Sequence, residues 1–246
     1  MHPALLDTGH RKEPLPARPW ALTMEWHELA LLHWPVDPDQ VQRLLPDGLQ
    51  IETRDGAAWL GVVPFVMRNV RPRWLPPAPG AANFPELNLR TYVTYRGVPG
   101  VWFFSLDAGS KLAVRGARLG FGLPYFDARM QCERSSTQIR YASERTHRGA
   151  PPATLQASWE LPQTYAAPAA GTLAHWFVER YRMYVVLRGR IRVGHIAHAP
   201  WQLAETKVAL TTCDMARLCG IELRGAPAHT HAAAPLTVAG WLPSQD

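Results

Sequence analysis

Residues 84–95 read FPELNLRTYVTY, and residues 101–107, after the turn sequence RGVPG, read VWFFSLD. From Glu86 onward polar and apolar side chains alternate, which is the period of a β-strand with two different faces. The connecting residues 96–100 contain glycine and proline, which are typical turn residues. This stretch therefore predicts two consecutive strands, and the alternation in the first indicates which side chains share a face.

The polar face of the first strand carries Glu86, Asn88, Arg90 and Tyr92. Alternate residues of a strand lie about 7 Å apart, twice the strand rise, so a carboxylate, an amide, a guanidinium and a phenol form one row. On the outside of a sheet this row would be an ordinary hydrated surface. On the inside of a closed sheet it would be a row of ligands for a small polar molecule, and the pattern alone leaves both interpretations open.

Further elements are predicted on both sides of this stretch. Asp37 as N-cap, with Pro38 at the first helical position, indicates a short helix. Ser110 caps a second helix that runs to about Phe121, and a third helix begins at Thr172. Strand patterns occur at 24–34, 49–54, 57–68, 126–135, 139–143, 155–161, 184–187 and 191–198.

Local turn and packing signals connect these elements. Asp55–Gly56 tolerates positive φ angles and predicts a hairpin between the strands at 49–54 and 57–68. Residues 71–85 are too rich in proline for regular structure and are expected to form a long loop. On the helix after Ser110, small residues form a stripe that would let a neighbouring backbone approach closely. The stripe consists of Ala113, Gly116, Ala117 and Gly120.

The balance of many strands against three or four helices predicts one α+β domain. Its sheet is expected to be large and mostly antiparallel, and to close into a β-barrel, because closure removes exposed strand edges. Residues 18–246 are expected to form this single domain, and residues 1–17, which are polar and contain prolines, a flexible N-terminal tail.

Composition argues against several functional classes. The 246-residue chain has a net charge of +6, but its basic residues are spread along the sequence, which argues against a nucleic-acid partner. It contains no apolar run of the roughly 20 residues that a membrane-spanning helix needs, and its first twenty residues lack the apolar core of a secretory signal. We therefore expect a cytoplasmic protein without a membrane partner.

The sequence contains no recognisable metal or cofactor motif. His195 and His198 would point to opposite faces of a strand, and His229 with His231 has no obvious third ligand. The three cysteines cannot all pair within one chain and are expected to be reduced thiols. The expected cofactor content is therefore none.

Several segments, in order, resemble one known family. They are RPW at 18–20, HWPV at 33–36, AWLGVVPFVMRNVRP at 58–72, FPELNLRTYV at 84–93, GVWFFSLDAGSKLAV at 100–114, AR with LPYFDARM between 117 and 130, ERYRMY at 179–184 and HAPW at 198–201. Together they resemble the YqjF-like family, a bacterial family of unassigned function in the acetoacetate decarboxylase-like superfamily. The resemblance implies a closed, cone-like antiparallel barrel around an interior cavity.

The resemblance also bears on chemistry. In true acetoacetate decarboxylases a lysine of low pKa forms a Schiff base with the substrate ketone. Their motif resembles Gly-Arg-Glu-x-x-Gly-Phe-Pro-Lys-Lys at the end of a helix, and its lysine pair falls on Tyr125 and Phe126 here. A phenol and a phenyl ring cannot form an imine, so this position cannot support the decarboxylase mechanism. The substrate-binding arginine of those enzymes falls on Pro35, and their cavity glutamate corresponds to Glu86.

The leading hypothesis is a cavity that binds a small anionic or carbonyl-containing metabolite. Its candidate ligand-binding residues are Glu86, Asn88, Arg90, Tyr92, Arg118 and Tyr125. Arg90 would hold the anionic group by a two-pronged contact, Glu86 would move a proton, and Tyr125 would donate a hydrogen bond to a carbonyl.

Three alternatives stay open at this point. They are acid/base catalysis on a keto-acid-like substrate, Schiff-base chemistry through Lys111 or Lys207, and a non-catalytic scaffold whose interior is filled by aromatic side chains. Members of the superfamily commonly assemble, so a homo-oligomer is compatible with the resemblance, although nothing in the sequence specifies one.

Overall fold

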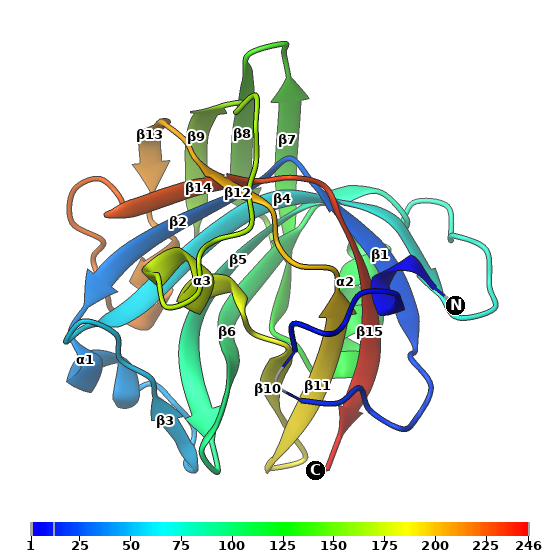
Figure 1. The fold of residues 1–246 in the computed structure, drawn as a ribbon. Coiled ribbons are helices and arrows are strands. Elements are labelled where there is room, and N and C mark those ends of the chain that lie inside the picture. Colours follow the sequence, from blue (N-terminus) through cyan, green and yellow to red (C-terminus); the bar gives the residue numbers. More distant parts are fainter. Residues whose placement is uncertain (1, 12, 246) are drawn as a thin grey trace.

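The computed structural model describes residues 2–11 and 13–245 as a mostly β structure (Figure 1). The strands are β1 (Leu22–His27), β2 (Leu29–Val36), β3 (Leu49–Ile51), β4 (Ala58–Pro72), β5 (Phe84–Tyr95), β6 (Val98–Ala108), β7 (Tyr125–Arg134), β8 (Gln138–Arg145), β9 (Thr154–Glu160), β10 (Arg182–Leu187), β11 (Arg190–His198), β12 (Leu203–Glu205), β13 (Val208–Cys213), β14 (His229–Ala233) and β15 (Leu236–Ser244). The helices are α1 (Pro38–Gln42), α2 (Lys111–Phe121), α3 (Leu173–Val178) and two short 3-10 helices, η1 (Pro3–Leu5) and η2 (Met215–Cys219).

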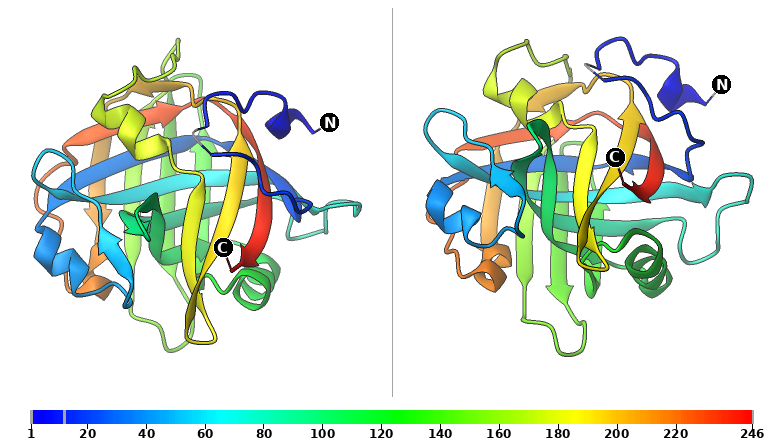
Figure 2. Two further views of the ribbon diagram at one scale, coloured as in Figure 1. Left: turned by 60° about the horizontal axis from the view of Figure 1, so that its bottom comes forward. Right: turned by 90° about the horizontal axis from the view of Figure 1, so that it is seen from below.

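Seven strands pair in a closed ring. β4 pairs with β1, β1 with β15, β15 with β11, β11 with β10, β10 with β6, β6 with β5, and β5 again with β4. Most of these pairings are antiparallel, whereas β6 runs parallel to both β10 and β7. The expected α+β fold with a mostly antiparallel sheet is confirmed, and the pairings give that sheet the form of a ring (Figure 2).

The ring and the strands β7, β8, β9 and β13, which continue the sheet beyond it, enclose two apolar cores. One lies on the inward face of the ring and includes Phe65, Tyr92 and Tyr125. The other includes Leu89 of β5 and Trp159 of β9, and it lies where β7, β8, β9 and β13 cover the outward side of the ring. Because β5 contributes to both cores, its two faces are both buried, and its polar row is an interior feature.

The segment at 24–34, expected to be one strand, forms two strands that follow one another along β4. Glu28 separates β1 from β2 with a left-handed φ of 46°, and β4 pairs with both strands in turn. The Glu28 carboxylate accepts hydrogen bonds from Arg68 and Arg134, at 3.2 and 3.5 Å. The prediction of one continuous strand was therefore wrong. Because of this bend, the edge of β1 that faces away from β4 pairs with β15, whereas the corresponding edge of β2 pairs with β14.

The hairpin predicted at Asp55–Gly56 is only partly formed. The turn adopts the expected positive φ angles, 55° and 78°, but its ladder is the single bridge between Arg54 and Ala57. β3 pairs instead with β5, which corrects the predicted pairing of 49–54 with 57–68. The proline-rich loop is also shorter than 71–85, because β4 continues through Pro72 and β5 begins at Phe84.

Helix α2 begins as predicted, with the Ser110 hydroxyl accepting a hydrogen bond from the Ala113 N–H at 3.2 Å. Its stripe of small residues is a contact surface only in part, because Ala113 and Ala117 pack against the inward core. A Cβ atom added to Gly116 or Gly120 would meet no atom within 4 Å outside its own helix, so the close approach of a neighbouring backbone expected along the stripe does not occur at its glycines. Gly122 ends the helix with a φ of 65°.

The N-terminal segment packs on the ring. Ala4 is buried beside Trp241 in a small cluster against β11 and β15, and Arg11 donates a hydrogen bond to the Ile196 carbonyl at 2.6 Å. Ala4 and Arg11, which lie in the segment expected to be a flexible tail, therefore contact the ring.

Candidate functional site

The polar row of β5 points into the ring. Tyr92 belongs to the inward core, whereas Leu87 and Leu89, the alternate residues, belong to the outward one. Glu86 and Asn88 are 1% and 5% exposed, and Arg90 is partly buried. A row that would be an ordinary wet surface on an open sheet is thus removed from water, and each polar group in it requires a partner.

Glu86 and Tyr125 form a buried pair between β5 and β7. The Tyr125 hydroxyl donates to a Glu86 carboxyl oxygen at 2.9 Å. Burial raises the pKa of Glu86 to about 8, an effect that the hydrogen bond from Tyr125 partly opposes. Burial, followed by the charge of Glu86, raises the pKa of Tyr125 well above its ordinary value. Near neutral pH the pair is uncharged, and the carboxyl retains its proton.

Asn88 and Arg90 follow Glu86 along the same face. The Asn88 Oδ1 atom and the Arg90 Nε atom are buried and have no hydrogen-bond partner among the described residues. An Arg90 Nη atom makes two long contacts, 3.3 Å to the Tyr92 hydroxyl and 3.5 Å to the Phe177 carbonyl. Buried polar atoms without partners are rare in folded proteins, so this part of the row has unused hydrogen-bonding capacity.

Tyr92 is held by a histidine that the sequence reasoning missed. The Nε2 atom of His33, on β2, lies 2.6 Å from the Tyr92 hydroxyl, and the imidazole stacks on Phe177 with ring centroids 3.6 Å apart. Burial, followed by the charge of Arg90, lowers the pKa of His33, so its ring is neutral. α3 thus packs against the inward side of β2 and β5 (Figure 1). HWPV at 33–36 was noted only for its resemblance, and no local pattern connects His33 with β5.

Arg180 is a second guanidinium beside the row. Its Cζ atom and that of Arg90 both lie 5.6 Å from the centre of the Tyr92 ring. An Nη atom of Arg180 donates to Glu52 at 3.1 Å, and its Nε atom is buried without a partner. The motif ERYRMY contains Arg180 and is the signal that could have identified it.

A second cluster of aromatic side chains lines the ring near β1 and β11. Trp26 and Trp201 have ring centroids 5.7 Å apart, and His198 lies 5.4 Å from Trp201 and 5.0 Å from Tyr181. Burial lowers the pKa of His198 to about 4. This part of the interior is therefore lined mainly by aromatic rings, unlike the polar row of β5.

Arg118 and the lysines lie away from the row. Arg118, on α2, donates to the backbone carbonyl of Tyr125 at 2.7 Å, so it contacts the strand that carries Tyr125 rather than Glu86. Lys111 and Lys207 are exposed, and Lys12 lies outside the described residues. Schiff-base chemistry through Lys111 or Lys207 therefore has no support in their placement.

Neither a cluster of metal-ligating side chains nor a helix suited to cross a membrane occurs in the described part of the chain. Within residues 2–11 and 13–245, no group of three or more His, Cys, Asp or Glu side chains has the arrangement to hold a metal ion. In the same residues, no helix is both long enough and apolar enough to cross a membrane.

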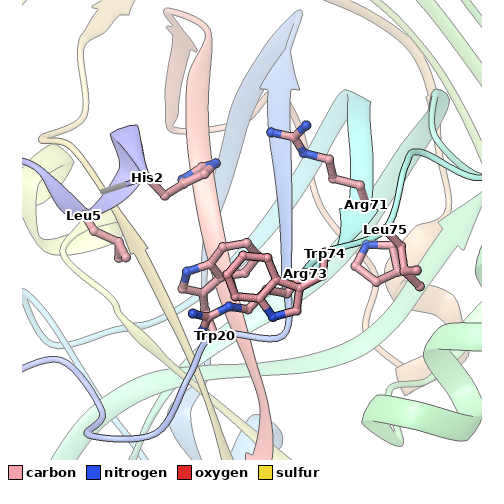
Figure 3. A pocket seen from close by; sticks show the side chains of 8 residues that line it. His2, Leu5, Trp20, Arg71, Arg73, Trp74 and Leu75 are labelled. Carbon is pink, nitrogen blue, oxygen red and sulfur yellow. The ribbon is translucent and has the colours of Figure 1, made fainter.

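Two hollows open on the surface, both away from the Glu86–Tyr125 pair. One of about 580 Å³ lies between Gly48, Arg96 and Gly189. The other, of about 700 Å³, lies between the N-terminal segment and the end of β4, where Arg73 and two tryptophans meet (Figure 3).

Comparison with solved structures identifies the fold. Acetoacetate decarboxylase from Legionella pneumophila superposes with a TM-score of 0.62 at 12% sequence identity, covering 95% of this chain and 92% of that one. The enduracididine biosynthesis enzyme MppR, complexed with pyruvate, superposes with a TM-score of 0.57 at 14% identity, covering 93% and 90%. At this identity the likeness shows an acetoacetate decarboxylase-like fold.

Comparison of sequences identifies the family. The model of the DUF2071 family, described as an uncharacterized conserved protein, matches residues 23–237. The uncharacterized protein YqjF of Bacillus subtilis (strain 168) is 40% identical over 224 residues, covering 90% of this chain and 91% of the relative. The chain belongs to the YqjF-like DUF2071 family, whose resemblance to acetoacetate decarboxylases is one of fold.

Proposed function

We propose that this protein binds, on the inward face of its ring, a small carboxylate that also carries a carbonyl or hydroxyl group. The observation that carries the proposal is the row of Glu86, Asn88 and Arg90, where a neutral carboxyl lies beside buried polar atoms without partners. A structural neighbour, MppR, has been solved with pyruvate, a compound of this class. That precedent supports the chemical class of the ligand.

The anionic group belongs at the Arg90 end. Arg90 and Arg180 flank Tyr92, and Glu52 balances one of their two charges. Each guanidinium also has a buried Nε atom without a partner. A carboxylate here would complete the hydrogen bonds of Arg90 and cancel the remaining positive charge, and charge-assisted bonds of this kind are among the stronger ones in proteins.

The uncharged end of the ligand belongs toward Glu86. Because Glu86 keeps its proton near neutral pH, its carboxyl can donate a hydrogen bond to a carbonyl oxygen, while Tyr125 holds its other oxygen. The Asn88 Oδ1 atom can accept a hydrogen bond from a hydroxyl group of the ligand. Cα atoms of Arg90 and Glu86 are separated by four residues of strand, about 13 Å, so the ligand is longer than a three-carbon acid if it reaches both.

A thermal-shift panel of keto and hydroxy carboxylates tests this proposal. At least one compound should raise the unfolding temperature of the wild type, and Arg90→Ala should abolish that rise. Arg96→Ala is the matched control, because Arg96 lies in the turn after β5 and stacks on Tyr95. If no compound gives a shift that depends on Arg90, the interior is a filled scaffold rather than a binding site.

Acid/base catalysis is a second candidate, and one observation favours it. A carboxyl with a pKa of about 8 exchanges its proton near physiological pH, which suits removal of a proton next to a carbonyl. Incubating bound keto acids in D₂O and following the C–H signals by NMR measures this activity. Exchange that is lost in Glu86→Gln supports catalysis, whereas equal exchange in both proteins argues for binding alone.

A further inference from the structure

The 700 Å³ hollow on the outside of the ring is built from two segments far apart in sequence. His2, Leu5 and Trp20 come from the N-terminal part of the chain, and residues 71–75 come from the end of β4 and the loop after it. Figure 3 shows these side chains gathered around one opening. Its volume lies within the range of small-molecule sites, and its walls are mainly indole, leucine and proline.

The central feature of the hollow is an arginine held between two tryptophans. The Arg73 Cζ atom lies 4.8 Å from the centre of the Trp20 ring and 4.7 Å from that of Trp74 (Figure 3). Both rings lie within the distance of a cation–π contact, and the Arg73 Nε atom is buried without a partner among the described residues. A guanidinium held in this way is preorganised to bind a carboxylate through two parallel hydrogen bonds.

The backbone conformation of Trp74 supports a ligand-binding role for this arrangement. Trp74 adopts a φ of 70°, in the left-handed region that bulky residues rarely occupy. Its side chain is 85% exposed, so burial of the indole does not offset this conformation. Backbone strain of this kind tends to occur at ligand-binding sites, where it places a side chain for a purpose. Here it places the Trp74 indole over Arg73.

The charged side chains that line the hollow are both arginines. Arg71 and Arg73 both line it, and its eight lining residues include no Asp or Glu. Arg71 has one weak side-chain contact, 3.4 Å to the Thr23 hydroxyl. Two guanidiniums without a carboxylate among the lining residues favour an anion, and the indole walls favour a flat apolar body attached to it.

We propose that this hollow is a second binding site, separate from the ring interior, for an aromatic carboxylate. The ligand's carboxylate pairs with the edge of Arg73, with Arg71 adding charge, and its ring lies against the exposed indole of Trp74. The site uses none of the residues of the β5 row, so it stands independently of the function proposed for the interior.

Isothermal titration calorimetry with 1-naphthoate and its uncharged analogue 1-naphthamide tests the site. Wild type should bind naphthoate at least tenfold more tightly than naphthamide, and Arg73→Met, which keeps the apolar stem, should weaken naphthoate binding at least tenfold. Trp74→Ala should weaken it about fivefold and should fold normally, because the indole is mostly exposed. Arg96→Met is the matched control, since Arg96 also stacks on one aromatic ring, that of Tyr95.

Four results would overturn the proposal. The first two are no binding of naphthoate at 5 mM and equal affinity for naphthoate and naphthamide. The third is an affinity of Arg73→Met for naphthoate within twofold of that of the wild type. The fourth is loss of naphthoate binding in Arg90→Ala instead, which would move the anion to the ring interior. Co-sedimentation with phosphatidylglycerol vesicles in the absence of naphthoate binding would make the hollow a membrane-contact surface, and that outcome too contradicts a small-molecule site.

Discussion

Replacing Glu86 by glutamine tests the central electrostatic claim about the ring interior. In the folded protein the Glu86 carboxyl has a pKa of about 8, whereas in the unfolded chain it has the ordinary value of about 4.3. Between these values the folded state binds more protons than the unfolded state. The free energy of unfolding therefore falls as pH rises through this range, and it levels off above the folded-state pKa.

The magnitude follows from the same two pKa values. Between pH 6.5 and 8.5, this one group should lower the stability of the wild type by about 2 kcal/mol. Glu86→Gln preserves the size and polarity of the side chain but cannot ionise, so this contribution should disappear. Other titrating groups, such as His198 and Asp107, are present in both proteins and cancel in the difference.

Urea unfolding at half-unit steps from pH 6.5 to 8.5 measures the effect. The difference in unfolding free energy between Glu86→Gln and wild type should grow by about 2 kcal/mol across the range. Glu144→Gln is the control, because Glu144 is an exposed carboxylate on β8 and its replacement should leave the pH slope unchanged. Parallel curves for wild type and Glu86→Gln would refute the claim that Glu86 is protonated in the folded state.

Three further substitutions test the packing that holds the site. Asp107→Ala should lower the unfolding free energy by about 3–5 kcal/mol in urea titrations, because it leaves the buried Arg145 without its carboxylate. Gly122→Ala should lower it by about 2–4 kcal/mol, since the position has a φ of 65° and a Cβ atom would lie 2.1 Å from Leu187. Gly120→Ala should raise stability by up to about 1 kcal/mol, because the position is helical and open. Equal effects of the two glycine substitutions in thermal unfolding would contradict this account of the end of α2.

Local signals in the sequence predicted local structure. The alternation from Glu86 to Tyr95 and the capping residue Ser110 each depend on neighbours a few positions away, and each was confirmed. The bend at Glu28 had no such signal, because glutamate is not a residue that favours positive φ. The pairing of β3 with β5 could not be predicted from local sequence either, since it depends on which strands meet after the ring closes.

The candidate site likewise contains residues that the sequence could predict and residues that it could not. Glu86, Asn88, Arg90 and Tyr92 follow from a strand period and from the closed sheet that the resemblance implied. His33 and Arg180 come from β2 and from the residues after α3, and only the three-dimensional fold brings them to Tyr92. Sequence can place residues on one face of one strand, whereas a site assembled from several strands needs the register between them.

The contact between Tyr125 and Glu86 explains why this frame suits hydrogen bonding better than nucleophilic attack. An amine is nucleophilic at neutral pH only when burial and a neighbouring positive charge lower its pKa. At this position Tyr125 carries a phenol instead, and burial beside the Glu86 carboxyl, 2.9 Å away, raises the pKa of that phenol well above its ordinary value. The phenol therefore stays protonated near neutral pH and is not a nucleophile. With a phenol in place, the pair remains neutral and holds a proton between two oxygens. The Tyr125–Glu86 pair therefore has the chemistry of a hydrogen-bond donor and not of a nucleophile that forms a covalent bond.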